Sequence, residues 1–258
     1  MSMVQMRSGY IGQIFNSIQG EGPHVGRRQV FVRFSGCPWN CRYCDTEKFR
    51  STARKCEVET KPGLMVFKIV ENPMTAAQVL QHVKRLTTPD THSISLTGGE
   101  PLLAGDFLVE VAKECKRLKL RTYLETNGID SKVMKSVLPY TDIAAVDVKL
   151  PEHEAVPRER WGKLLEEELA CTKLANGAGI DTFVKIVVLS STRASTITNV
   201  CKKLSHIGVP VVLQPVTPAR KIRTGPSMTH VYRLAEAAAR AGVEVAVIPQ
   251  VHKLLGIQ

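Results

Sequence analysis

The sequence predicts an α/β protein with a parallel sheet, and two observations carry that prediction. Segments rich in β-branched residues alternate with segments of helical periodicity along most of the 258 residues. Such alternation indicates βαβ units with right-handed crossovers. Hydrophobic residues make up 43% of the chain, enough for one domain with a substantial core. About six β/α units fit either a partial β/α barrel or a doubly wound sheet.

The expected elements follow in order along the chain. Strands are expected at Gln29–Phe34, Ser93–Leu96, Arg121–Glu125, Ile143–Val148, Thr182–Leu189, Val211–Gln214 and Glu244–Ile248. Helices are expected at Thr75–Leu86, Asp106–Leu118, Ser131–Leu138, Arg158–Ala175, Thr196–Ile207 and Thr229–Ala241. Thr75 with Gln78 predicts a capping box, and Asp106 is expected to cap the second helix. Arg50–Pro73 is expected to be an insertion of loop and a short hairpin, and Pro151–Pro157 a long loop.

Composition favours some function classes over others. No apolar run approaches the roughly 18 residues of a membrane span, and Met1–Tyr10 lacks the apolar core of a signal peptide. We therefore expect a cytoplasmic protein without membrane contact. The formal charge is +11, but Lys and Arg are dispersed without a block of five or six. This pattern predicts a solvated basic surface, or attraction of anionic substrates, rather than nucleic-acid binding.

Three of the seven cysteines form a C-x3-C-x2-C cluster. Thiolates are soft donors that suit iron–sulfur chemistry. Cys37, Cys41 and Cys44 would leave one iron of a [4Fe–4S] cluster free for another ligand, since four thiolates close such a cluster. The alternative from spacing alone is a zinc knuckle with a distant fourth ligand such as Cys56 or His24. The scattered cysteines are expected to be ordinary apolar or surface residues: Cys56, Cys115, Cys171 and Cys201.

A second motif, Thr97-Gly98-Gly99-Glu100-Pro101, follows the expected strand Ser93–Leu96. Glycines let the backbone approach a ligand closely, and a carboxylate pairs with an ammonium group. Alone, this motif would also suit a tight turn into the next helix. Together with the cysteine spacing, it identifies the chain as a member of the radical S-adenosylmethionine (SAM) superfamily. That resemblance implies a partial (β/α)6-type barrel, in one domain spanning residues 1–258.

Further segments resemble 7-carboxy-7-deazaguanine synthases over nearly the whole chain. They are the opening Ile14–Gly22 (IFNSIQGEG), Arg33 four residues before Cys37, Cys44-Asp45-Thr46, Glu125–Gly128 (ETNG) and the tail Gln250–Gly256 (QVHKLLG). The resemblance implies conversion of 6-carboxy-5,6,7,8-tetrahydropterin to 7-carboxy-7-deazaguanine with loss of ammonia. It implies a reduced cluster that cleaves SAM, a radical that takes hydrogen from C6, and regeneration of SAM.

The same resemblance implies residue roles. For the metals, Cys37, Cys41 and Cys44 would hold the [4Fe–4S] cluster, and Thr46 would bind Mg²⁺. For SAM, the expected contacts are Gly99, Glu100, Glu125, Lys149, Gln214 and Pro215. For the substrate, they are Ile18, Gln19, Gly20, Glu21, Arg33, Thr97, His252 and Gln258, with residues 250–258 closing the site. One departure is Asp147-Val148-Lys149, where relatives often carry Ser-Pro-Lys; this puts the Asp147 contact in doubt, and Lys185 has no assigned role.

The resemblance also implies partners. We expect a homodimer and an electron donor such as flavodoxin or ferredoxin, and a product that feeds queuosine, archaeosine or a secondary metabolite. The segment 50–73 would shield SAM or dock the donor. Two alternatives remain at this point: a radical SAM activase of a glycyl-radical enzyme, and a zinc-dependent nucleic-acid-binding module. Metal analysis separates the zinc module from the others, and substrate turnover separates the two enzymes.

Overall fold

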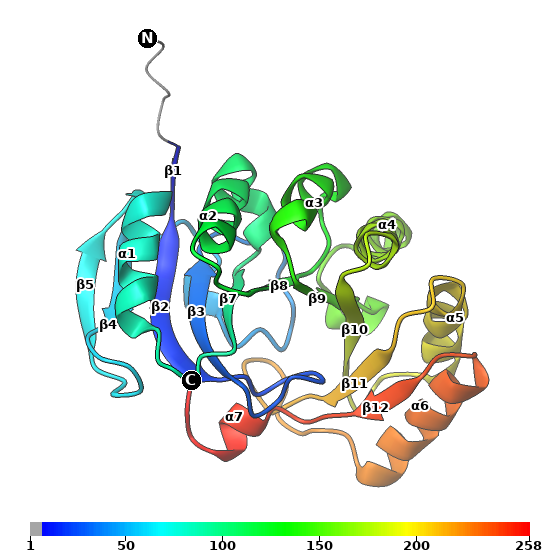
Figure 1. Cartoon of the computed structure of the whole chain (residues 1–258). Coiled ribbons are helices and arrows are strands. Elements are labelled where there is room, and N and C mark those ends of the chain that lie inside the picture. The colour runs from blue at the N-terminus through cyan, green and yellow to red at the C-terminus, as the bar shows by residue number, and fades with distance from the viewer. Residues whose placement is uncertain (1–6) are drawn as a thin grey trace.

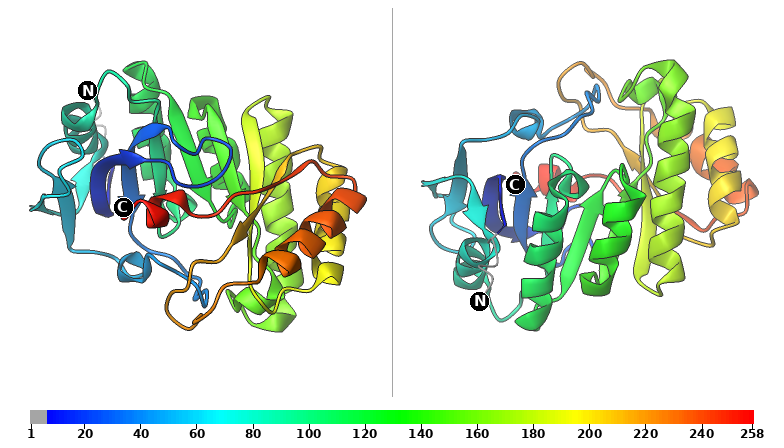
Figure 2. Two further views of the ribbon diagram at one scale, coloured as in Figure 1. Left: turned by 90° about the horizontal axis from the view of Figure 1, so that it is seen from below. Right: turned by 90° about the horizontal axis from the view of Figure 1, so that it is seen from above.

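A computed structural model of the chain describes residues 7–258 and shows an open, strongly curved sheet with helices on its convex side (Figure 1). Seven neighbouring strands are parallel. They are β3 (Arg28–Phe34), β7 (Ser93–Gly98), β8 (Thr122–Thr126), β9 (Ile143–Asp147), β10 (Asp181–Val188), β11 (Val211–Pro215) and β12 (Val245–Val247). Six helices connect them in sequence, which confirms the partial (β/α)6-type barrel. Two views along the sheet show the same arrangement (Figure 2).

The helices agree with the expected ranges to within a few residues. They are α1 (Ala76–Leu86), α2 (Asp106–Arg117), α3 (Ser131–Val137), α4 (Trp161–Gly177), α5 (Ala194–Ser205), α6 (Met228–Arg240) and the short α7 (Val251–Leu254). The capping box of Thr75 and Gln78 is present. The prediction that Asp106 caps this helix is wrong, because Gly105 is the cap and Asp106 is the first helical residue. At that position its negative charge interacts favourably with the positive end of the helix dipole.

Three strands extend the sheet beyond β3, and two of them form the hairpin expected in Arg50–Pro73. β2 (Ile11–Ile18) runs antiparallel to β3, β4 (Lys55–Glu59) runs parallel to β2, and β5 (Phe67–Glu71) completes the hairpin with β4. The strand β2 was not expected. Its first six residues are all buried, including Gln13 and Asn16, so the sequence there lacks the alternation that signals a half-exposed strand. A two-stranded sheet of β1 (Ser8–Gly9) and β6 (Met74–Thr75) lies beside it.

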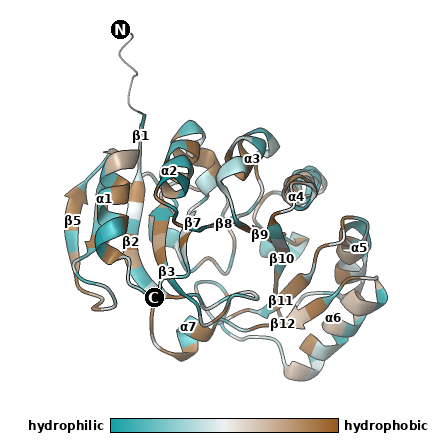
Figure 3. Cartoon of the chain, viewed as in Figure 1, coloured by the Kyte–Doolittle hydropathy of each residue, from teal (hydrophilic) through white to brown (hydrophobic). Residues whose placement is uncertain are grey.

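The helices pack against the outer face of the sheet through two large apolar clusters, and hydropathy colouring shows apolar residues along the strands and inner helix surfaces (Figure 3). Cys56, Cys115, Cys171 and Cys201 are fully buried, which confirms that they act as core residues. Among residues 7–258, no helix is both long and apolar enough to cross a membrane.

A third apolar cluster lies on the inner face of the barrel. It contains Tyr123, Ile143, Ala145, Phe183 and Val212, which lie near the N-terminal ends of β8 to β11. Because strand side chains alternate between faces, the inward residues two positions later are polar. These are Glu125, Asp147, Lys185 and Gln214. The barrel thus has an apolar floor and a polar upper part at the C-terminal strand ends.

Candidate active site

A cavity with two connected lobes opens at the C-terminal ends of the strands. The first lobe, of about 790 Å³, contains all three cysteines of the cluster motif. The second, of about 640 Å³, lies beneath the C-terminal segment. The lobes share a common wall made of Glu21, Asp45, Thr46, Thr97, Gly98, Glu125, Asp147 and Lys185. The two lobes therefore adjoin each other along this wall.

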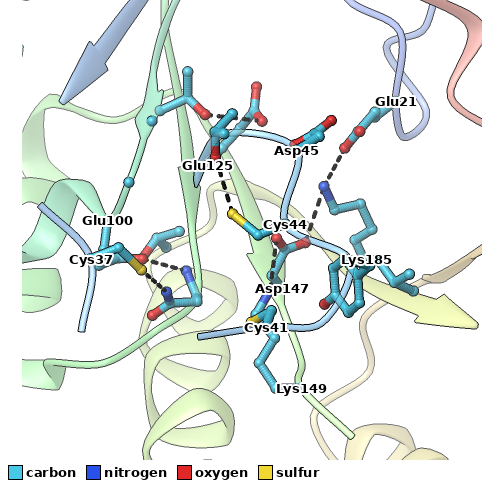
Figure 4. A pocket seen from close by; sticks show the side chains of 18 of the residues that line it. Glu21, Cys37, Cys41, Cys44, Asp45, Glu100, Glu125, Asp147, Lys149 and Lys185 are labelled. Atoms are coloured by element: carbon cyan, nitrogen blue, oxygen red, sulfur yellow. Dashed lines mark hydrogen bonds and ion pairs between the residues drawn. The ribbon is translucent and has the colours of Figure 1, made fainter. Parts of the chain in front are cut away.

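The cysteine loop, residues 36–46, is held on both sides by backbone hydrogen bonds. Cys37 N donates to Arg50 O at 2.9 Å, and Arg42 N donates to His153 O at 3.1 Å. The guanidinium of Arg220 donates to Cys41 O at 2.9 Å. The insertion, the loop after β9 and the loop after β11 thus all support the cysteine loop. Figure 4 shows the three cysteines around one cavity, with Glu100 near Cys37 and Lys149 beyond Cys41.

The donor set fits an iron–sulfur cluster, because thiolates are the soft, anionic donors that such clusters take. Among residues 7–258, no group of three or more His, Cys, Asp or Glu side chains lies close enough to hold one metal ion. Burial raises the pKa of Cys37 to about 11 and also raises that of Cys41. Positive charge is needed to keep these groups as thiolates, and an iron cluster supplies it.

Gly98 and Gly99 place β7 against the cysteine loop. Gly98 has φ +123°, in the region that favours glycine. A Cβ atom on Gly99 would overlap the carbonyl oxygen of Gly36, and Glu100 N donates to that same oxygen at 2.8 Å. These glycines line the first lobe. Glycine is required at position 99 because the backbone there packs directly against the backbone of the cysteine loop.

Glu100 is only 1% exposed and is engaged mainly with the protein. Its carboxylate accepts from Leu102 N at 2.9 Å, from Asn127 N at 2.8 Å and from the Thr126 hydroxyl. Burial raises the pKa of Glu100 to about 7. Since a carboxylate has about four acceptor positions, one position remains for a ligand. The Glu100 side chain therefore joins β8 to the motif after β7.

Glu125 lies in the wall between the lobes. Its carboxylate accepts from Ser95 Oγ at 2.8 Å, Gln19 Nε2 at 3.0 Å and Thr97 Oγ1 at 3.3 Å. Burial raises the pKa of Glu125. The Gln19 amide also donates to Gln29 Oε1 and accepts from Glu21 N, so both of its N–H groups are used. Gln19 thus positions Glu125 and the turn at Glu21.

Lys185 and Asp147 form a charged centre, and the sequence had left the role of Lys185 unassigned. The Lys185 ammonium pairs with Glu21, and with Asp147 Oδ1 at 3.2 Å. The other oxygen of Asp147 pairs with Lys149 at 3.2 Å. Burial alone would raise the pKa of Glu21, but the charge of Lys185 and the hydrogen bonds from Lys185 and Gln250 together outweigh burial and lower this pKa. Lys185 lies two positions beyond Phe183 on β10, so strand alternation was the signal that predicts its inward direction.

The second lobe contains every residue expected at the substrate: Ile18, Gln19, Gly20, Glu21, Arg33, Thr97, His252 and Gln258. The guanidinium of Arg33 lies 5.1 Å from the centre of the Phe15 ring. Its buried Nε has no hydrogen-bond partner among the described residues, as expected of a donor that awaits a ligand. Gly20 contacts His252 so closely that a Cβ atom would overlap the imidazole.

The C-terminal segment, residues 250–258, lies across this lobe. Gln250 Nε2 donates to Glu21 Oε1 at 2.7 Å and to Asp45 Oδ2 at 3.3 Å. The Lys253 ammonium also pairs with Asp45, at 3.3 Å. Gln258 accepts from Gln13 Nε2 at 2.9 Å, and its main-chain oxygen accepts from Ser17 Oγ at 2.7 Å.

Only two of the three remaining residues expected to contact SAM line the cavity. Lys149 and Gln214 line the first lobe, whereas Pro215 ends β11 and lines neither lobe. Gln214 Nε2 donates to Glu21 Oε1 at 3.2 Å, and its buried Oε1 has no partner in the described part of the chain. Sequence reasoning assigned no individual role to Tyr43, Asn127 and Gln250, which line the first lobe. All three lie inside the motifs that it recognised.

Comparisons with known proteins identify the family of the chain. The model of the radical SAM superfamily matches residues 31–204. A protein of Methanocaldococcus jannaschii named 7-carboxy-7-deazaguanine synthase is 38% identical over 96% of this chain and 99% of its own length. One of Geobacter sulfurreducens with the same name is 36% identical over 95% of this chain and 96% of its own length.

Solved structures share the fold. The crystal structure of QueE from Escherichia coli has a TM-score of 0.59 at 18% identity and covers 93% of each chain. That of Streptococcus suis SuiB bound to S-adenosylmethionine has a TM-score of 0.56 at 14% identity, over 84% of this chain and 51% of that one. By its superfamily match and its relatives above 30% identity, the chain belongs to the radical SAM superfamily and, within it, to the 7-carboxy-7-deazaguanine synthases.

Proposed function

We propose that this chain is a radical SAM lyase that converts 6-carboxy-5,6,7,8-tetrahydropterin to 7-carboxy-7-deazaguanine with loss of ammonia, in 7-deazapurine biosynthesis. The observation that carries the proposal is the shared wall between the cysteine lobe and the polar second lobe. The residues of this wall would hold SAM on one side and the substrate on the other, and would exclude water between them.

In the first lobe, Cys37, Cys41 and Cys44 would hold the [4Fe–4S] cluster. When bound, the cluster and SAM supply one-electron radical chemistry. Gly99, Glu100, Glu125, Lys149 and Gln214 would position SAM. The free acceptor position of Glu100 and the unpartnered Oε1 of Gln214 support this, because both suit cationic or N–H groups. Pro215 has no such support.

In the second lobe, Arg33 would pair with the substrate carboxylate. Its unpartnered Nε and the planar guanidinium suit bidentate binding. Ile18, Gly20 and His252 would form the walls around the pterin, and Gln19 would keep Glu21 and Glu125 in place. Residues 250–258 would close the site by the contacts of Gln250 and Lys253 with Asp45.

Thr46 would bind Mg²⁺ beside the substrate carboxylate. It lines both lobes, and a hard cation with several non-protein ligands needs few oxygens from the chain. We also infer a cytoplasmic homodimer that receives electrons from flavodoxin or ferredoxin. Light scattering on the purified protein tests the dimer. A single species with the mass of the monomer would contradict it.

The test is turnover after anaerobic reconstitution with iron and sulfide. With SAM, dithionite, Mg²⁺ and 6-carboxytetrahydropterin, we expect 7-carboxy-7-deazaguanine by mass spectrometry without stoichiometric loss of SAM. Removal of Mg²⁺, or Thr46→Val, should raise the substrate KM about tenfold, whereas Thr46→Ser retains the oxygen and should change it little. SAM cleavage that leaves the pterin intact would contradict the proposed substrate while retaining the superfamily.

A further inference from the structure

Acidic residues are distributed very unevenly in the second half of the chain. Residues 182–235 contain eight Lys and Arg side chains and no Asp or Glu. The eight are Lys185, Arg193, Lys202, Lys203, Arg220, Lys221, Arg223 and Arg233. Lys185 pairs with Glu21 and Asp147, and Arg220 pairs with Glu47. The other six cations form no ion pair among residues 7–258. The stretch covers β10, α5, β11 and the first half of α6, so these elements carry a net positive charge.

Part of this stretch lies directly against the cysteine loop. We call residues 217–225, between β11 and α6, the basic loop. Lys221 N donates to Arg42 O at 3.3 Å, and Arg220 donates to Cys41 O. Ile222 packs with Tyr43 in one apolar cluster. The basic loop therefore packs directly against the cysteine loop.

The outer surface of the basic loop and the start of α6 combine charge with apolar area. Lys221 and Arg223 are exposed. Met228 is 50% exposed and Tyr232 is 60% exposed. These two are four residues apart on α6, so they lie side by side on the helix. Exposed cations that are followed within a few residues of the chain by an exposed methionine and an exposed aromatic are the composition expected of a protein-docking surface.

The route by which electrons reach the cluster indicates which kind of protein binds this surface. This inference rests on the proposed function. SAM and substrate would occupy the cavity side of the cluster, so an electron must arrive through the outer side of the cysteine loop. We propose that Lys221, Arg223, Met228 and Tyr232 dock the acidic electron-carrier protein that reduces the cluster. Complementary charge steers association and orients the carrier, and the apolar pair stabilises the docked complex.

The first variant reverses two charges on this surface. Lys221→Glu/Arg223→Glu is compared with Lys202→Glu/Lys203→Glu, a matched change at the exposed last turn of α5. That turn lies at the opposite edge of the barrel, because α5 begins at the C-terminal end of β10. With recombinant flavodoxin, its reductase and NADPH, we expect kcat/KM for flavodoxin to fall about tenfold or more in the loop variant. The control should change less than about twofold.

Turnover with dithionite should be unchanged in both variants, and calorimetry should show weaker flavodoxin binding only in the loop variant. Tyr232→Ala should weaken binding at high salt as well, since its contribution is apolar. Equal effects in the two double variants would overturn the proposal, as would a parallel loss with dithionite. Loss of transfer-RNA binding with unchanged flavodoxin turnover would assign the surface to nucleic acid instead. A wild-type protein that binds flavodoxin but makes no product with dithionite would contradict the proposed function alone.

Discussion

At the scale of single residues, the most unusual feature is a lysine inside the barrel. The Lys185 side chain is 11% exposed, and those of Glu21 and Asp147 are 15% and 28% exposed. Burial alone would lower the pKa of Lys185, but Asp147 and Glu21 raise it well above its usual value. Lys185 therefore stays charged and neutralises two carboxylates that contact both lobes. It is a positioning residue for Glu21, which also receives Gln214 and Gln250.

Replacing Lys185 tests this role. In Lys185→Met, two partly buried carboxylates lose their cation, and we expect the free energy of unfolding to fall by about 3 kcal/mol at pH 7. Lys185→Arg keeps the charge and should recover part of the loss. The control is Lys48→Met, which breaks the exposed pair with Glu57 and should cost less than about 1 kcal/mol. Urea unfolding of the cluster-free protein measures all three, and a loss in Lys185→Met no larger than in the control would argue against the buried centre.

At the scale of elements, the site depends on how two strand ends meet. The end of β7 and the cysteine loop after β3 approach so closely that Gly99 N donates to Phe34 O and Glu100 N to Gly36 O, both at 2.8 Å. This contact joins the cluster loop to the motif that would bind SAM. The spacing between the cysteine loop and the motif after β7 is therefore set by backbone contacts, which are stiffer than side-chain contacts.

Gly99→Ala should disturb this joint. The added methyl group overlaps the Gly36 carbonyl, and overpacking of this kind costs about 1–3 kcal/mol. We expect a lower melting temperature and less iron bound after reconstitution, measured by iron analysis and absorbance. Gly162→Ala is the matched control, because a Cβ at Gly162 meets nothing within 4 Å and alanine favours the helix there. Full iron loading in Gly99→Ala would show that the loop tolerates the shift.

At the scale of the whole molecule, the barrel combines an apolar floor with a polar upper part whose loops hold one another. His153 is one such support. It is fully buried, Leu150 N donates to its Nδ1 at 2.9 Å, and its Nε2 lies 2.8 Å from Val187 O. Burial lowers the pKa of His153 to about 3, so the folded protein holds it neutral. The main chain of His153 in turn supports the cysteine loop at Arg42.

Global stability should therefore depend on pH through His153. Its folded pKa lies below the unfolded value of about 6.5, so the unfolded chain binds the proton first. The contribution is complete above about pH 6.5 and decreases as the pH falls towards the folded pKa. Between pH 7.5 and 5.0 the loss is about 2 kcal/mol. Urea unfolding at both pH values should show this loss in the wild type relative to His153→Gln, and equal losses in the two proteins would contradict it.

Much of the fold and site could be predicted because their signals are local. The seven parallel strands, their helices and the capping box at Thr75 all follow from periodicity within short windows. The cysteine spacing and the Gly-Gly-Glu motif carry their chemistry in adjacent residues. The strand β2 escaped prediction because Gln13 and Asn16 are buried by partners far along the chain, Glu57 and Leu86.

By itself, the sequence determined the fold class and the family, since each depends on residue types at short spacing. Only the tertiary structure decided which charges meet. Lys185 and Glu21 are 164 residues apart, and Gln250 and Glu21 are 229 apart. Such pairs form because barrel closure brings strand ends together at one edge, and no local pattern encodes a contact between them. The same closure placed the basic loop against Cys41 and left Lys221 and Arg223 exposed.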